Sequence, residues 1–149
     1  MRNAEKSFTA YLKSLISGTV QSAMPMGFST INFYCENYQE EAYPCVTLTY
    51  INEDITNLPF NIILAQIDVK TTDHKTDDCN RIKDELLKAL YLDVPCHSRA
   101  INILDYNEVT PTTVKGKLLW ESKEVIKGLT TRPELRRRVV TLKLTAISS

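Results

Sequence analysis

The last part of the chain constrains the fold more than any other segment. Between Val139 and Ile147, every second residue is apolar, and the polar residues Thr141, Lys143 and Thr145 stand between them. Successive side chains of a β-strand point to opposite faces of a sheet, so this alternation predicts a strand with one buried and one solvated face. The chain must therefore build a sheet that is covered on one side.

Five further segments show strand patterns. Alternation, β-branched residues or a short apolar run predict strands at 31–35, 45–51, 60–70, 101–106 and 116–125. Pro44 stands at the entry to the second of these, where a missing backbone N–H is tolerated. The third begins apolar on both faces and then alternates, which is typical of a central strand.

The N-terminal segment carries the spacing of an amphipathic helix. Its apolar stripe follows the i, i+3, i+4, i+7, i+8 rule and consists of Phe8, Tyr11, Leu12, Leu15 and Ile16. We expect Asn3 or Ser7 to cap its start and Gly18 to end it.

A second helix is expected after the loop at residues 71–78. Its apolar positions are Cys79, Ile82, Leu86, Leu87 and Leu90. Thr76 or Asp77 should cap this helix, with acids at the positive end of its dipole.

The elements follow the order helix, three strands, helix, three strands, with no repeat or interior linker. A chain of 149 residues is long enough for one core. We therefore expect a single α+β domain spanning residues 1–149, with a largely antiparallel mixed sheet of about five or six strands flanked by two amphipathic helices. No apolar run approaches the roughly 20 residues that cross a bilayer, so no membrane contact is expected.

The formal net charge is zero, but the charges are unevenly distributed. The segment 36–85 holds eleven acids against four bases, and the segment 115–143 holds nine bases against three acids. These charges either coat separate surfaces, meet within one subunit, or join unlike faces of neighbouring copies.

One dense group of acids and potential ligands comprises Asp68, Asp73, His74, Asp77, Asp78 and Cys79. A small metal-dependent nuclease or hydrolase built on Asp68, Asp73 and His74 is the enzyme hypothesis. The run lacks the glycine and distal glutamate of a calcium loop, and helix capping accounts for Asp77 and Asp78. We expect no metal site.

The cysteines Cys35, Cys45, Cys79 and Cys96 form no C-x-x-C pair. We expect them to be reduced and mostly buried, as in a reducing cytosol. Cys96 next to His97 is weak evidence for a nucleophile, because adjacent residues of an extended segment point to opposite sides. No phosphate-binding glycine loop is present, so no cofactor and no catalytic residue is assigned.

Arginines cluster near the end of the chain. Arg136, Arg137 and Arg138, with Arg132 and Lys127 nearby, lie in or beside a segment that we expect to be a long loop from Lys127 to Arg138. They could bind phosphates. Without interleaved aromatic residues, an acidic protein neighbour is the better interpretation.

Three features together resemble one family. They are the N-terminal amphipathic helix, the strand entry EEAYPCVTLTY, and the strand-loop-helix unit LAQIDVKTTDHKTDDCNRIKDELLKAL; the closing basic segment and strand also fit. Over most of its length the chain resembles the tail terminator, or tail-completion, proteins of long-tailed bacteriophages, which form a sixfold ring at the head-proximal end of the tail tube.

The resemblance implies a virion structural protein, assembled in the host cytoplasm, that acts through surfaces and not through catalysis. It implies contact with other copies of itself, with the tail tube protein and with a head-completion or connector protein, while DNA passes through the ring without sequence-specific binding. Lys127, Arg132 and Arg136 to Arg138 are then candidates for the assembly interface. The candidates for the complementary acidic side are Glu40, Glu41, Glu53 and Asp54. A head–tail connector or head-completion protein is the alternative of similar size and element order.

Overall fold

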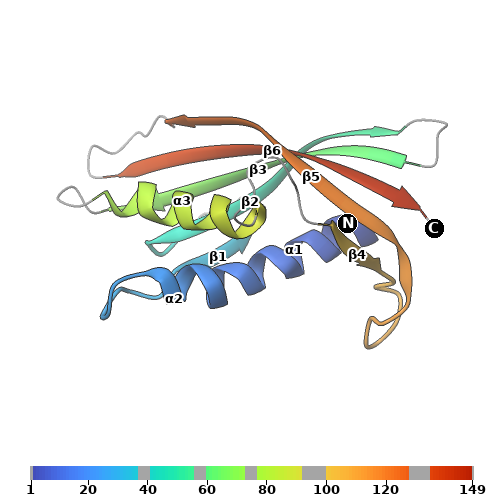
Figure 1. Ribbon diagram of the computed structural model, residues 1–149, viewed down its shortest axis with the longest axis horizontal. Coiled ribbons are helices and arrows are strands. Elements are labelled where there is room, and N and C mark those ends of the chain that lie inside the picture. Colours follow the sequence, from blue (N-terminus) through green and yellow to red (C-terminus); the bar gives the residue numbers. More distant parts are fainter. Residues whose placement is uncertain are drawn as a thin grey trace.

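The computed structural model describes residues 2–36, 41–55, 60–72, 77–91, 100–127 and 135–148, with side chains left undescribed at 52–55, 60–61, 122–127 and 148. Its elements, labelled in Figure 1, are α1 (Asn3–Leu15), a π-helical turn η1 (Ile16–Val20), α2 (Gln21–Ala23), β1 (Asn32–Cys35), β2 (Cys45–Ile55), β3 (Phe60–Thr71), α3 (Asp78–Tyr91), β4 (Ala100–Leu104), β5 (Val114–Lys127) and β6 (Arg136–Ser148).

The strands form one six-stranded sheet in the order β1-β2-β3-β6-β5-β4. The β1–β2 pair is parallel, and every other neighbouring pair is antiparallel. This confirms the expected α+β fold with a largely antiparallel mixed sheet. The two expected helices are present as α1 and α3, and the short η1 and α2 are added to the expected order.

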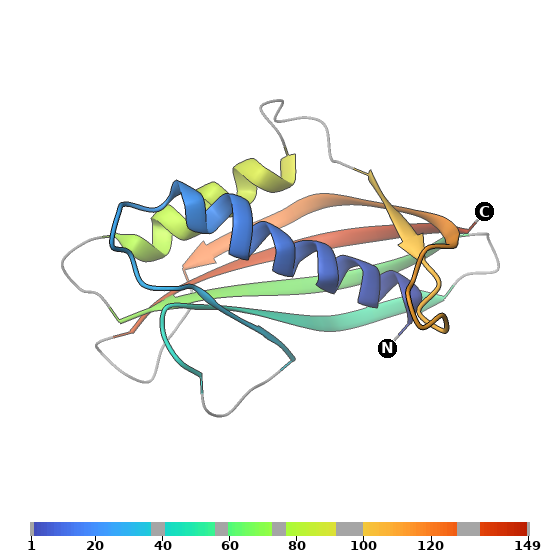
Figure 2. The same ribbon diagram turned by 90° about the horizontal axis from the view of Figure 1, so that it is seen from below.

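The helices α1 and α3 lie on the same face of the curled sheet (Figures 1 and 2). The core between them and the sheet contains fully buried side chains from both layers, among them Phe8, Leu12, Ile82, Leu86, Ile67, Leu142 and Trp120. Burying one such side chain contributes about 1.5–3 kcal/mol. The alternation that marks the last strand is confirmed, since Val140, Leu142 and Leu144 are fully buried while Thr141 and Lys143 are only half-buried.

The prediction for the start of α1 was wrong. Arg2 is the N-cap, and the backbone N–H of Arg2 donates to Glu5 Oε1 at 3.4 Å. Asn3 and Ser7 lie inside the helix, where their oxygens have another function. Asn3 Oδ1 accepts the backbone N–H of Tyr106 at 2.9 Å, and the buried Ser7 Oγ accepts that of Leu104 at 3.0 Å. These residues therefore attach the helix to the edge strand β4.

Gly18 does not end the first helix either. It lies in η1, where it is exposed, and helical backbone continues to Ala23. The apolar face continues past the glycine, because Ile16, Val20 and Met24 are all buried. A glycine commonly ends a helix because it can adopt the left-handed conformation of a C-terminal cap. Here the buried apolar face continues beyond Gly18, and its packing keeps the backbone helical.

The three arginines at 136–138 also differ from expectation. They belong to the start of β6 instead of a loop, with Arg136, Arg137 and Arg138 opposite Thr71, Lys70 and Val69 of β3. Lys127 is the last residue of β5 and lies opposite Arg138. Pairing with β3 along all three residues, and with β5 at Arg138, holds this part of β6 in the sheet, although its side chains are charged.

Candidate assembly surface

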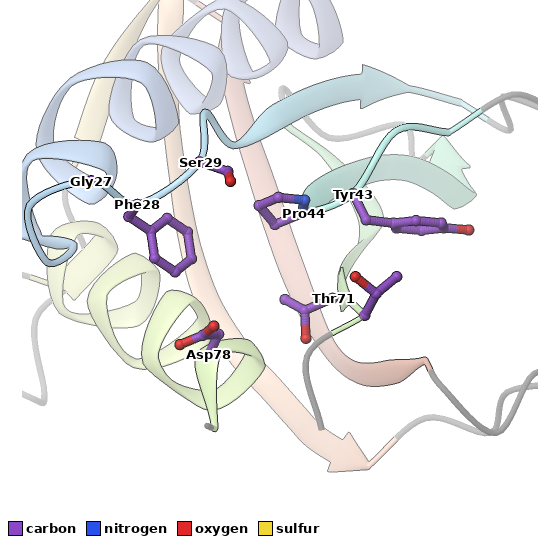
Figure 3. Close-up of a pocket in the computed structure, with 8 residues that line it drawn as sticks. Gly27, Phe28, Ser29, Tyr43, Pro44, Thr71 and Asp78 are labelled. Atoms are coloured by element: carbon purple, nitrogen blue, oxygen red, sulfur yellow. The ribbon is translucent and has the colours of Figure 1, made fainter. Parts of the chain in front are cut away.

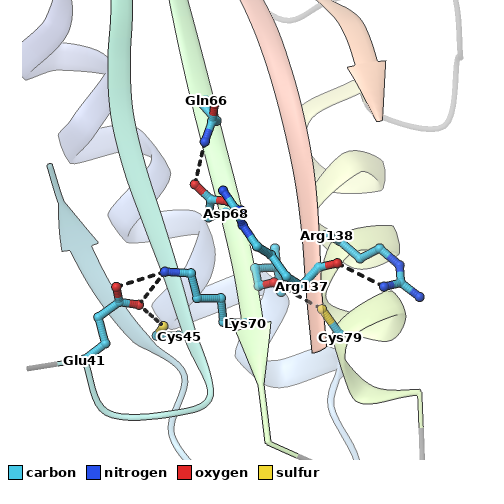
Figure 4. Close-up of polar contacts among 9 residues, drawn as sticks. Glu41, Cys45, Gln66, Asp68, Lys70, Cys79, Arg137 and Arg138 are labelled. Carbon is cyan, nitrogen blue, oxygen red and sulfur yellow. Dashed lines mark hydrogen bonds and ion pairs between the residues drawn. The ribbon is translucent and has the colours of Figure 1, made fainter. Parts of the chain in front are cut away.

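A group of charged side chains lies at one end of the sheet, on the face opposite α1 and α3 (Figure 4). We call Glu41, Asp68, Lys70 and Arg137 the charged cluster. Asp68 and Lys70 are two residues apart on β3, so they share a face, and Arg137 lies opposite Lys70 on β6. Sheet register therefore brings acids and bases from distant parts of the sequence together.

Asp68 and Arg137 form the first pair of the charged cluster. Arg137 Nε donates to Asp68 Oδ1 at 2.6 Å, and Gln66 Nε2 donates to Asp68 Oδ2 at 2.8 Å. The Asp68 side chain is 8% exposed and that of Arg137 is 27% exposed. Both carboxylate oxygens of Asp68 thus accept a hydrogen bond, as a buried acid requires.

Lys70 and Glu41 form the second pair. Lys70 Nζ donates to the two Glu41 oxygens at 2.9 and 3.0 Å. The Cys45 thiol also donates to Glu41 Oε2 at 3.1 Å. Burial, together with the Glu41 carboxylate, raises the pKa of Cys45 to about 12, so this thiol is protonated at neutral pH and is a poor nucleophile.

Arg138 directly follows Arg137 on β6, so its side chain points to the opposite face of the sheet, which is the face that the helices cover. Its Nε donates to Asn80 Oδ1 at 2.6 Å, and its Nη2 lies 3.9 Å from Asp77 Oδ1. These contacts join the start of β6 to the first turn of α3.

Cys79 is fully buried in the same region, and its thiol donates to the Val69 carbonyl at 3.1 Å. Burial is the main cause that raises its pKa to about 11. Cys35, which is half-buried, also has a raised pKa, chiefly because of burial. The expectation of buried thiols is therefore confirmed for Cys45 and Cys79, and Cys35 is less buried than expected.

The acidic group that suggested an enzyme is divided by the structure. Asp68 lies on the face opposite the helices and pairs with Arg137, whereas Asp77 directly precedes α3 and Asp78 begins it. Asp73 and His74, like Cys96 and His97, fall outside the described residues. Within the described ranges, no three or more His, Cys, Asp or Glu side chains gather where they could hold a metal ion.

The predicted interface residues are placed as follows. Arg136 is exposed at the start of β6, whereas Glu41, Arg137 and Arg138 have partners within the chain. Glu53 and Asp54 lie on β2 and Lys127 ends β5, all without described side chains. Glu40 and Arg132 lie outside the described residues. Of the four candidates whose side chains are described, three meet opposite charges or polar groups inside one subunit, and an interface role for the set stays a prediction.

Sequence reasoning missed the partners within this surface. Gln66 and Cys45 were placed on strands but were not linked to Asp68 and Glu41. The alternating positions of Gln66, Asp68 and Lys70 are visible in the sequence, and they place all three on one face. The register with β6, which selects Arg137 as the partner, is not visible in it.

No protein-family model matches this chain, and a search of curated proteins finds no match either. None of the helices in the described ranges combines the length and the apolar character needed to cross a bilayer.

Proposed function

We propose that this chain is a structural subunit of a long-tailed bacteriophage virion. In this proposal it forms a sixfold ring at the head-proximal end of the tail tube, ends tube polymerisation and provides the joint to the head. Two things support it: the resemblance of the element order and segments to tail terminator proteins, and a site composed of surface charges already held in place by hydrogen bonds.

The observation that carries the proposal is the charged cluster on the sheet face opposite α1 and α3. Asp68 accepts two hydrogen bonds and Glu41 accepts three, so their side chains are fixed before any partner arrives. A surface fixed in advance loses less side-chain entropy on binding. Such an arrangement suits repeated contact with identical neighbours.

The same contacts argue against chemistry at these residues. A general base or a metal ligand must be reached by its substrate or ion, and the Asp68 side chain is only 8% exposed. Asp68 is instead bound to a guanidinium and an amide, and the Cys45 and Cys79 thiols have pKa values raised to about 12 and about 11. These residues are better explained as structural groups than as parts of a hydrolase.

Arg136 is the most direct candidate for contact with a neighbouring subunit. It is exposed at the start of β6, next to two arginines whose partners lie within the chain. A ring built from one contact repeated head to tail joins two different surfaces of each copy. The acidic surface that would receive Arg136 is proposed to lie on β2, which carries Glu53 and Asp54.

Electron microscopy of the purified protein, alone and mixed with tail tubes, tests the proposal. Rings seated at one end of each tube are expected. Arg136→Glu should weaken assembly, and Arg136→Glu combined with Glu53→Arg or Asp54→Arg should restore it. Arg81→Glu, which reverses another exposed arginine on α3, is the matched control. Tubes that never carry the protein would contradict the proposed function.

The alternative, a connector or head-completion protein, has a different partner. Pull-down of tail tube protein supports the terminator, whereas exclusive pull-down of a portal-side protein supports the connector. Calorimetry with magnesium, manganese and zinc tests the metal-dependent enzyme: binding heat together with a thermal shift would favour it.

A further inference from the structure

The sheet face opposite α1 and α3 carries apolar side chains at the end remote from the charged cluster. We call four of them the outer patch: Ile62 and Leu64 on β3, Leu119 on β5 and Ile147 on β6. Their chain neighbours Ile63, Leu118 and Ala146 are buried in the core. Because successive side chains of a strand alternate between faces, the four residues of the outer patch point away from the helices.

Sheet register makes the outer patch continuous. Thr145 of β6 lies opposite Ile62 on one side and opposite Leu119 on the other. Ile147 lies two residues beyond Thr145, so it shares this face. Side chains that are directly opposite each other on one face have Cβ atoms about 4.5–5.5 Å apart, and diagonal neighbours are within reach of long side chains. The apolar residues therefore gather around one threonine.

Within the described residues, no helix covers the outer patch, because α1 and α3 lie on the other face (Figures 1 and 2). Ile147 is 42% exposed, and the other three residues of the patch are half-buried. A sheet face that meets water normally places polar residues between the apolar ones, but β3 is apolar at four successive positions from Ile62 to Ala65. Such a run is typical of a strand that is covered on both faces.

A small molecule does not fit this surface. Small ligands bind in concave sites, and the described pocket of about 280 Å³ lies elsewhere, beside the start of α3 (Figure 3). None of the outer-patch residues lines that pocket, and its charged residue, Asp78, is paired with Arg81 at 3.6 Å. The outer patch belongs instead to a broad sheet face, which fits another protein surface.

The charges of this face are paired with each other. Glu121 of β5 lies opposite Lys143 of β6, with Glu121 Oε1 3.6 Å from Lys143 Nζ. The charged cluster contributes two further pairs of one acid and one base. Lys117, at the border toward β4, donates to Asn102 Oδ1 at 2.6 Å. A face with paired charges can meet a copy of itself without strong repulsion, whereas it offers little attraction to a nucleic acid or a highly charged protein.

The face is also large enough for a dimer. The adjacent strands β2, β3, β6 and β5 have 11, 12, 13 and 14 residues. With a rise of about 3.3 Å per residue and a strand spacing of about 4.8 Å, they span about 40 by 19 Å. Because the sheet is curled, contact covers less than this whole area. It therefore falls toward the lower limit of stable interfaces, which bury about 600–1,000 Å² per partner.

We propose that two copies of this chain pack face to face through the outer patch, about a twofold axis that runs along the strands. This axis brings patch against patch, whereas an axis across the strands would lay the outer patch against the charged cluster. Aligned sheets pack about 10 Å apart with their strands rotated by about 30°. The twofold contact does not rest on the proposed ring, which joins Arg136 to the acids of β2.

Sedimentation equilibrium of the Arg136→Glu variant tests the contact. Arg136 alternates with Arg137 and so lies off the outer face, and its replacement weakens only the proposed ring. A mass of two chains is expected at about 100 µM protein, and a mass of one chain at that concentration would overturn the proposal. No tail tubes are present, so the result is independent of whether the protein seats on them.

Charges placed in the outer patch make the assignment specific. In the Arg136→Glu background, Leu119→Glu and Leu119→Lys should each raise the dissociation constant of the dimer at least about tenfold, because a charge would be buried. Val109→Glu replaces another apolar residue, 103% exposed in the loop between β4 and β5, and is the matched control. It should leave the mass unchanged; an equal loss in all three variants would contradict the proposed contact.

Mixing the two Leu119 variants identifies the occupant of the patch. Each variant alone places like charges in the joined patches, whereas the mixture brings opposite charges together and should restore the mass of two chains. Misfolding cannot produce such a recovery, and a different partner protein cannot produce it either. If both variants are folded by circular dichroism and their mixture stays monomeric, a second copy is not what covers the outer patch.

Discussion

Arg137 Nε donates a 2.6 Å hydrogen bond to Asp68 Oδ1, joining the two central strands of the sheet across 69 positions of sequence. Neither residue is on a loop: Asp68 pairs with both β2 and β6, and Arg137 pairs with β3. The pair therefore ties the most acidic part of the chain to its most basic part inside one subunit.

Replacing Arg137 with Gln should lower the free energy of unfolding by about 1.5–3 kcal/mol, because it leaves the nearly buried Asp68 without its charged donor. Urea denaturation measures this change. Arg136→Gln, the exposed neighbour on the same strand, should change stability by less than about 0.5 kcal/mol. In the double variant Asp68→Asn, Arg137→Gln, the loss should be smaller than the sum of the single losses; additive losses would contradict direct coupling.

The buried thiols predict a loss of stability at alkaline pH. The pKa of Cys45 is raised from 9.0 to about 12 and that of Cys79 to about 11, with burial as the largest cause. Above pH 9, thiols of the unfolded chain ionise while those of the folded chain do not, so unfolding releases protons. The stabilising contribution is complete below pH 9 and is lost as pH rises toward 11 and 12.

Cys45→Ala should remove part of this dependence. The difference in unfolding free energy between wild type and variant should shrink by at most about 1.4 kcal/mol per pH unit above pH 9. Below pH 8 the plots of unfolding free energy against pH for wild type and variant should run parallel. A constant difference there reports the cavity left by the thiol, and a change in the difference above pH 9 reports its ionisation. Parallel curves up to pH 11 would show that Cys45 does not titrate as described.

Glu108 organises the loop between β4 and β5. Its carboxylate accepts the backbone N–H groups of Thr112 and Thr113 at 3.1 and 2.8 Å and the Thr113 hydroxyl at 2.9 Å. The hydrogen bonds from Thr113 and Thr112 lower the pKa of Glu108 from 4.5. The contribution of Glu108 to the stability of this loop is therefore present above pH 4.5 and is lost as pH falls through the lowered pKa.

Glu108→Ala should speed hydrogen exchange of the Thr112 and Thr113 amides at neutral pH, since both lose their acceptor. NMR of the exchanging amides measures this directly. Glu121→Ala, at an exposed site on β5, is the control and should leave both rates unchanged. Unchanged rates in Glu108→Ala would mean that the loop is held by other contacts.

Ser7 couples α1 to β4. Because Ser7 Oγ is buried and accepts the Leu104 N–H, Ser7→Ala should cost about 1–3 kcal/mol of stability. Ser14→Ala removes an exposed hydroxyl that bonds within the same helix, and it should cost less than about 0.5 kcal/mol. Thermal or urea unfolding compares the two, and equal effects would contradict the coupling.

Most of the fold could be predicted from periodicity, because burial imposes it locally. The stripe of α1 and the alternation along β6 follow directly from which side faces the core. The end of the first helix could not be predicted this way. Gly18 has a high propensity to end helices, and burial of Val20 and Met24 overrides that propensity.

The candidate site was less predictable, since register and pairing decide it. The arginines at 136–138 were expected in a loop because they follow Gly128 and Pro133 in one basic segment. Alternation then sends Arg137 to one face and Arg138 to the other, where each finds a separate partner. Which acid meets which base depends on contacts between residues far apart in sequence, and local patterns of residues do not reveal those contacts.

Exposed strand borders can recruit further chains and lead to amyloid-like fibres. On β4, the side chains of Ser7 and Asn3 occupy backbone donors at and just beyond the end of the strand. Templated growth of fibres from that border would first require the N-terminal helix to peel away. Hydrogen bonds to two short polar side chains thus shield the end of β4 against pairing with another chain.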